Sequence, residues 1–113
     1  MLSLKTEDGI QVTTVYLSSG ASLADVRKYV QHIYQPRFPQ IILGDFNFDA
    51  KESNTLSRYF TEIGLKQLVN RPTHMEGRTI DHVYVSPELK CEITFKSPYY
   101  SDHVAVCVKL NKD

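Results

Sequence analysis

The chain has 113 residues, of which 42% are hydrophobic and 23% are charged, a composition typical of one folded domain and unlike that of disordered proteins. Lysine and arginine together equal aspartate and glutamate at 13 each, so the net charge does not indicate a nucleic-acid partner. The sequence has no long apolar run and no secretory signal pattern. We therefore expect a single domain over residues 1–113, without membrane attachment, in an intracellular location that can include the nucleus.

The first half of the chain predicts a hairpin, a helix and a buried strand, in that order. β-prone runs at 2–5 and 10–17 flank the turn signal of residues 7–9. Ser22 is expected to begin a helix that runs to about residue 34, with Asp25 as its capping-box partner. Prolines 36 and 39 then break the helical pattern, and residues 40–43, whose apolar run at 41–43 is continuous rather than alternating, are typical of a strand that is buried on both faces.

The second half adds another helix and three or four strands. A helix is expected from about Ser53, ending at Gly64, followed by a short strand within 65–69. Residues 71–78 are polar and rich in turn formers, which predicts a surface loop. Three further strands are expected at 79–85, 89–95 and 103–110. The two cysteines, Cys91 and Cys107, lack any metal-binding or redox spacing, so we expect both to be reduced and buried.

Three short motifs carry the polar residues that suggest chemistry: residues 44–47 (GDFN), 79–82 (TIDH) and 101–103 (SDH). Because side chains alternate along a strand, Asp45 and Asn47 are expected on the same side of an extended segment, about 7 Å apart. Asp81 shares its strand face with Val83 and Val85, where a carboxylate needs a partner. A hydrogen bond to His103 would provide one and would fix the tautomer of the imidazole.

This residue set matches what phosphodiester hydrolysis requires. A water must be oriented and deprotonated, and negative charge on the phosphate oxygens must be neutralised, usually with Mg²⁺ or Mn²⁺ on oxygen ligands. Aspartate, asparagine and histidine can supply these functions. The three motifs together therefore favour a metal-dependent phosphodiesterase over an isolated Asx-turn or a surface ion pair.

In their order and in their amino acids, the three motifs resemble those of the endonuclease/exonuclease/phosphatase superfamily, which includes deoxyribonuclease I. The sequence of residues 72–85 is similar to that of endonuclease domains from mobile elements of the Helitron and non-LTR retrotransposon types. The resemblance covers nearly the whole chain but only the second half of the family domain. It implies an α/β fold that is a partial four-layer α/β/β/α sandwich, with one mostly complete sheet, two helices and an N-terminal hairpin.

The resemblance also implies roles for individual residues. Asp45 would orient or deprotonate the attacking water, Asn47 and Tyr16 would contact the phosphate, and Asp81 would orient a catalytic His103. Asp102 and Asp45 would bind Mg²⁺ or Mn²⁺. Tyr16 could equally be a core aromatic residue with its hydroxyl at the surface.

One part of the family's metal site has no counterpart in this sequence. The family's principal metal ligand is a glutamate in the absent first half, and neither Glu7, Glu52 nor Glu76 is expected on a strand directed at Asp45. Activity of the chain alone is therefore an open question. We expect a Mg²⁺-dependent phosphodiesterase acting on DNA. The alternatives are a non-catalytic remnant or interaction module, and a phosphatase acting on another phosphoester.

Two further expectations concern partners and the remaining histidines. The sheet face that contains Leu43, Val83 and Val85 should lack part of its cover, which predicts either a homodimer or a complementing N-terminal segment. His82 falls on the strand face opposite to Asp81, so we expect it, like His74, to be structural or exposed to solvent rather than a ligand.

Overall fold

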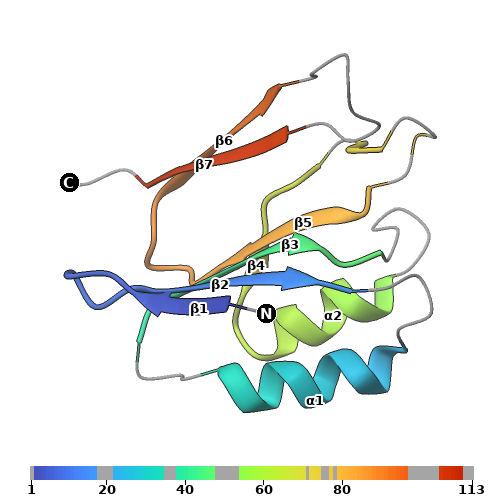
Figure 1. Ribbon diagram of the computed structural model, residues 1–113, viewed down its shortest axis with the longest axis horizontal. Helices are drawn as coiled ribbons and strands as arrows, with labels where there is room; N and C mark the ends of the chain where they lie inside the picture. The colour runs from blue at the N-terminus through green and yellow to red at the C-terminus, as the bar shows by residue number, and fades with distance from the viewer. Residues whose placement is uncertain are drawn as a thin grey trace.

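A computed structural model of the chain describes residues 2–17, 22–34, 38–47, 54–70, 72–74, 77, 79–96 and 105–110. These residues form a five-stranded sheet, a two-stranded sheet and two helices, so the predicted α/β class is confirmed. Figure 1 shows the elements in three layers, with both helices on one side of the five-stranded sheet and the two-stranded sheet on the other. The arrangement corresponds to three layers of the expected four-layer sandwich.

The five-stranded sheet is mixed, with the strand order β1-β2-β3-β5-β4. The predicted hairpin is formed by β1 (Leu2–Lys5) and β2 (Gln11–Tyr16), which pair antiparallel. Strand β3 (Gln40–Asp45) runs parallel to β2, and β5 (Asp81–Val85) runs antiparallel to β3. The short edge strand β4 (Lys66–Gln67) completes the sheet beside β5. Because β2 and β3 are parallel, the connection between them must cross over, and a helix lies within it.

Helix α1 (Leu23–Ile33) provides this crossover and begins as its sequence predicts. The Ser22 hydroxyl accepts from the backbone N–H of Asp25 at 3.2 Å, and the Asp25 carboxylate accepts from the backbone N–H of Ser22 at 3.1 Å. The bond from the backbone N–H of Ser22 to the carboxylate, together with the Ser22 side chain, lowers the pKa of Asp25. Helix α2 (Asn54–Glu62) is followed by Gly64, whose φ of +91° gives the left-handed turn expected at a helix end.

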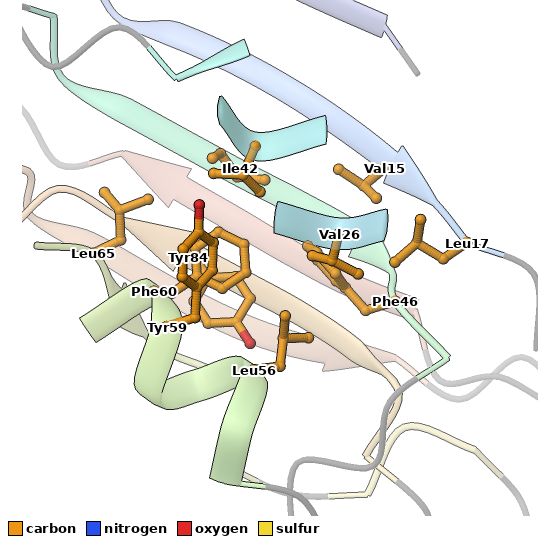
Figure 2. Packing of buried hydrophobic residues seen from close by; sticks show 11 residues of the cluster. Val15, Leu17, Val26, Ile42, Phe46, Leu56, Tyr59, Phe60, Leu65 and Tyr84 are labelled. Atoms are coloured by element: carbon orange, nitrogen blue, oxygen red, sulfur yellow. The ribbon is translucent and has the colours of Figure 1, made fainter. Parts of the chain in front are cut away.

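The helices and the sheet enclose a core that we call the helix-side core. It contains eleven buried residues: Val15, Leu17, Val26, Val30, Ile42, Phe46, Leu56, Tyr59, Phe60, Leu65 and Tyr84. Figure 2 shows that α2 directs its aromatic side chains toward the sheet. The rings of Phe60 and Tyr84 stack with their centroids 3.8 Å apart, and Phe46 meets both rings edge-on. This face of the sheet is therefore closed.

The opposite face is covered by a two-stranded antiparallel sheet, which we call the ribbon. It consists of β6 (Cys91–Lys96) and β7 (Ala105–Leu110). The ribbon-side core contains five buried residues, Ile10, Ile41, Val69, Val83 and Val85. The apolar side chains that pack around them are only partly buried: Val12, Leu43, Leu68, Leu89, Cys91, Ile93, Phe95, Val106, Val108 and Leu110.

Two expectations can be compared with the structure on this side of the sheet. The face that contains Leu43, Val83 and Val85 was expected to lack part of its cover: Val83 and Val85 are buried beneath the ribbon, whereas Leu43 is half-buried and the poorly covered strands are β1 and β2. Cys107 was expected to be buried, but it is exposed, because it projects from the outer face of the ribbon. Cys91 is half-buried, and both thiols are free. Among the described residues, no helix is long and apolar enough to cross a membrane.

Candidate functional site

Three of the residues expected at the site lie side by side on adjacent strands. The strand registers pair Tyr16 of β2 with Asp45 of β3, and Asp45 with Asp81 of β5. Residues directly opposite each other on neighbouring strands point to the same face of a sheet. Tyr16, Asp45 and Asp81 therefore form a transverse row at one end of the sheet, which we call the polar row.

The polar row lies on the ribbon side of the sheet. Along β5, Asp81 alternates with Val83 and Val85 of the ribbon-side core, whereas Tyr84 faces the helices. Both carboxylates are half-buried, whereas the side chain of Tyr16 is 76% exposed. Tyr16 is therefore not a core aromatic residue, and its ring borders the two aspartates at the open end of this face.

Two carboxylates directly opposite each other are an unfavourable pair. The Cβ atoms of such cross-strand neighbours lie about 4.5–5.5 Å apart, and like charges at this spacing destabilise a sheet. A cation between them, or a phosphate group bound through a cation, would relieve this repulsion. Asp45 and Asp81 therefore lie where one cation or one set of hydrogen-bond donors can serve both carboxylates.

Gly44 allows the main chain to reach this geometry. Its φ is +145°, and a Cβ atom at this position would overlap the backbone carbonyl of Val15 on β2. Any side chain would push β3 away from β2 immediately before Asp45. The glycine of the GDFN motif therefore sets the spacing between the strands that carry Tyr16 and Asp45.

Asn47 follows β3 in a tight turn rather than in the extended conformation that we expected. It has a φ of +54°, and its backbone N–H donates to Oδ1 of Asp45 at 3.0 Å, as in an Asx-turn. Its side-chain amide donates to the backbone carbonyl of Leu17. Asn47 is held against the end of β2 by this second bond, and the extended backbone on which the expected 7 Å spacing was based is not observed. The left-handed backbone suits asparagine better than most residues.

Thr73 supports the row from the loop that precedes β5, and it was not among the residues expected at the site. It is fully buried, and its hydroxyl oxygen lies 3.2 Å from the backbone nitrogen of Ile80 and 3.1 Å from that of Asp81, accepting from both. The backbone N–H of Phe46 in turn donates to the carbonyl of Ile80 at 2.9 Å. A threonine next to a proline in a polar loop gives little indication of such a role, because its bond to Asp81 spans eight positions of the sequence.

His82 lies behind the row, on the helix side, as its position in the strand predicts. It is 1% exposed, and its Nε2 lies 2.9 Å from the carbonyl of Thr79. A carbonyl can only accept, so Nε2 carries the proton, and in a neutral imidazole Nδ1 accepts from the Tyr84 hydroxyl at 2.9 Å. The ring also stacks on Phe46, with centroids 5.2 Å apart. His82 is thus a structural histidine.

The other expected site residues, Asp102 and His103, lie outside the described residues, so the predicted hydrogen bond between Asp81 and His103 stays a prediction. His74 is half-buried. Within the described ranges, no group of three or more histidine, cysteine, aspartate or glutamate side chains could hold a metal ion. Asp45 and Asp81 supply the oxygen donors that Mg²⁺ and Mn²⁺ prefer. The described part of the site therefore fits a divalent cation in the chemistry of its donors, with two carboxylates.

Known proteins resemble this chain in structure rather than in sequence. No protein-family model matches the sequence, and no curated protein matches it. Solved structures do share its fold, among them three at 16–20% sequence identity. One is an endonuclease/exonuclease/phosphatase family protein from Leptotrichia buccalis, with a TM-score of 0.66, 16% identity, and coverage of 97% of this chain and 52% of that one.

The second is the catalytic domain of human Nocturnin with a bound sulfate anion, with a TM-score of 0.56, 20% identity and coverage of 96% and 51%. The third is a mannosyl-6-phosphatase of Bacteroides thetaiotaomicron, with a TM-score of 0.61, 18% identity and coverage of 96% and 54%. The chain thus spans about half the length of each. It has the fold of one half of an endonuclease/exonuclease/phosphatase protein.

Proposed function

We propose that this chain carries the phosphate-handling half of a metal-dependent phosphodiesterase that acts on DNA. The observation that supports the proposal best is the polar row, in which Tyr16, Asp45 and Asp81 are paired in register at one end of the ribbon-side face. The row places two carboxylates and a phenol side by side, which are oxygen donors that suit a divalent cation and a hydroxyl that can donate to a phosphate.

In the proposed reaction each described residue has a separate task. Asp45 accepts a proton from the water that attacks phosphorus, and the Asn47 turn holds that carboxylate through the backbone N–H bond to Oδ1. The Tyr16 hydroxyl donates to a phosphate oxygen from its exposed position at the edge of the row. Asn47 has a second amide hydrogen, beyond the one it gives to Leu17, with which it can donate to the same phosphate.

Asp81 and two residues outside the described ranges, Asp102 and His103, complete the proposal. Asp81 and Asp45, together with Asp102, would hold Mg²⁺ or Mn²⁺, which when bound would neutralise charge on the phosphate oxygens. His103 would stabilise the transition state, and Asp81 would orient its ring. Two of the structural neighbours are a phosphatase and a member of the endonuclease/exonuclease/phosphatase family, so phosphoester hydrolysis is the chemistry that the proposal shares with them.

The proposal is tested by measuring how fast the purified chain nicks supercoiled plasmid DNA in Mg²⁺ or Mn²⁺. We expect nicking that EDTA abolishes. Asp45→Asn keeps the size of the side chain but removes the base, so it should reduce the rate by about a hundredfold or more, and His103→Ala should do the same. Glu62→Gln is the matched control, because Glu62 is an exposed acidic residue on α2, on the other side of the sheet.

Three other results would each contradict part of the proposal. Nicking that is equally fast in Asp45→Asn and in the unmodified chain would overturn the site. Hydrolysis of p-nitrophenyl phosphate without any plasmid nicking would replace the DNA substrate with a phosphomonoester. A folded chain that hydrolyses neither substrate with either metal would be a non-catalytic remnant or interaction module of the same fold.

A further inference from the structure

The edge of β5 that faces away from β3 is bonded by side chains over part of its length. Strand β4 has only two residues, and it pairs with the last two residues of β5. Nearer to the polar row, Oε1 of Gln67 accepts from the backbone N–H of Val83 at 3.2 Å. Closer still, Oγ1 of Thr73 accepts from the backbone N–H of Asp81 at 3.1 Å. These two side-chain oxygens therefore take the place that the carbonyls of a neighbouring strand have elsewhere in a sheet.

The Thr73 hydroxyl is also connected to the strand that carries the other aspartate. Its oxygen accepts from the backbone N–H of Ile80 at 3.2 Å, so its two lone pairs serve two successive peptide groups. The carbonyl of Ile80 in turn accepts from the backbone N–H of Phe46 at 2.9 Å. Phe46 directly follows Asp45, so one hydroxyl holds the start of β5 and, through Ile80, the end of β3.

This connection is shielded from solvent along its whole length. Thr73, Ile80 and Phe46 are each at most 2% exposed. A backbone N–H that loses its acceptor in such surroundings cannot bond to bulk water instead, so the main chain must either shift or leave the group unsatisfied. The conformation of this junction therefore depends on the Thr73 oxygen.

We propose that Thr73 is a positioning residue, whose hydroxyl fixes the Asp45 and Asp81 carboxylates in the relative placement that a divalent cation needs. It acts through the backbone of Ile80 and Asp81 rather than by contact with the cation. A cation shared by two carboxylates is sensitive to their separation, because Mg²⁺ holds its oxygen ligands at about 2.0–2.1 Å in nearly ideal octahedral geometry. As far as it concerns the cation, this inference rests on the proposed function.

Gln67 provides the matched control, because it makes the same kind of bond two residues further along β5. Its partner, Val83, is a residue of the ribbon-side core and has no polar side chain. Gln67→Met removes the oxygen acceptor at similar size, so it should destabilise the fold without moving the carboxylates. Thr73→Val removes the hydroxyl oxygen at nearly the same shape, whereas Thr73→Ser retains it.

The first measurement is the hydrogen exchange of the Phe46 amide, which needs no metal. In Thr73→Val we expect this amide to exchange at least tenfold faster relative to the amide of Ile42 in the middle of β3, because Ile80 is no longer held. Thr73→Ser should restore the ratio to within threefold of the unmodified chain, and Gln67→Met should leave it unchanged. A general loss of stability would speed both amides alike, so the ratio distinguishes it from a local change.

The second measurement is the dissociation constant of Mn²⁺, obtained from the broadening of the Asp45 and Asp81 amide signals in the folded chain. We expect Thr73→Val to raise this constant at least tenfold, and Thr73→Ser and Gln67→Met to stay within threefold of the unmodified chain. If Thr73→Val does not fold, Thr73→Cys replaces it. A thiol is only a weak acceptor, so this variant should still raise the constant at least threefold.

A folded Thr73→Val variant that binds Mn²⁺ as tightly as the unmodified chain would overturn the proposal, because Thr73 would then be only structural. An unchanged Phe46 exchange ratio would overturn the connection through Ile80. An equal loss of affinity in Gln67→Met, or a failure of Thr73→Ser to restore binding, would contradict the role of this hydroxyl. If the unmodified chain binds no Mn²⁺ at the polar row, the proposed cation site is wrong, and the exchange ratio still decides whether Thr73 holds the two strands.

Discussion

The two faces of the five-stranded sheet are built from the same strands but differ in how completely they are covered. On the helix side, eleven side chains are buried and only Leu23, Tyr34 and Ile63 pack against them partly exposed. On the ribbon side, five are buried and ten are only partly so. The difference indicates that the helix side holds most of the stability. The ribbon side, with the polar row at its end, remains available for binding.

The largest expected effect comes from replacing one phenylalanine on each side of the sheet with alanine. Phe60→Ala on α2 should lower the free energy of unfolding by about 3–5 kcal/mol, because the ring is fully buried and stacked on Tyr84. Phe95→Ala on the ribbon should cost about 1–2 kcal/mol, because its ring is only partly buried. Urea denaturation measures both values. Equal losses would contradict the contrast between the faces.

A second substitution tests the junction between β2 and β3. Gly44→Ala should destabilise the fold by about 2–4 kcal/mol, because the added methyl group overlaps the Val15 carbonyl and the backbone has a positive φ. Gly9→Ala is the matched control. Gly9 also has a positive φ, but an added Cβ there meets no atom within 4 Å, so its loss should be clearly smaller. If the urea midpoint falls equally in the two variants, the close approach of the strands is not the cause of the destabilisation in Gly44→Ala.

The third substitution concerns the histidine behind the polar row. His82→Leu fits a buried position but removes the imidazole that bonds the Thr79 carbonyl and the Tyr84 hydroxyl, so we expect a loss of about 2–3 kcal/mol in the free energy of unfolding. Because burial raises the pKa of Tyr84, its hydroxyl stays protonated near neutral pH and remains a donor. The tautomer is observable by nitrogen NMR of the histidine ring. A protonated Nδ1 in place of Nε2 would contradict this hydrogen-bond arrangement.

The smallest expected effect distinguishes the two faces of the ribbon by thiol chemistry. Burial raises the pKa of Cys91, so at pH 8 a smaller fraction of it is thiolate, and we expect it to react with Ellman's reagent about tenfold more slowly than the exposed Cys107. The difference between the two reaction rates should narrow as the pH rises above the pKa of Cys91, because its thiolate fraction then approaches one. Cys107→Ser assigns the faster phase. Equal rates in a two-phase reaction would show that both thiols are similarly accessible.

The sequence predicted most of the helices and strands, because their signals are local. The Ser22 and Asp25 capping box marked the start of α1 correctly, and strand alternation placed His82 and Asp81 on opposite faces. These features depend on residues within a few positions of each other. The fold class followed from the same local patterns together with the order of the three motifs.

The features that the sequence did not predict depend on contacts between distant residues. The Asn47 side chain is fixed against the end of β2 by its bond to Leu17, thirty positions away, and Thr73 supports Asp81 from a separate loop. Cys107 is exposed because the ribbon has no outer layer in the described structure, which an alternating apolar pattern cannot reveal. The extent of the ribbon's cover likewise depends on strand packing that no short segment encodes.

The polar row is tested most directly by titrating the folded, isotopically labelled chain with Mn²⁺ and following its backbone amide NMR signals. We expect selective broadening of the signals of Asp45, Asn47 and Asp81, which excess Mg²⁺ reverses and Asp45→Asn weakens strongly. This readout does not depend on catalysis or on the identity of the substrate. Broadening confined to the exposed acidic turn at Glu7 and Asp8, or its absence, would contradict a divalent-cation site at the polar row.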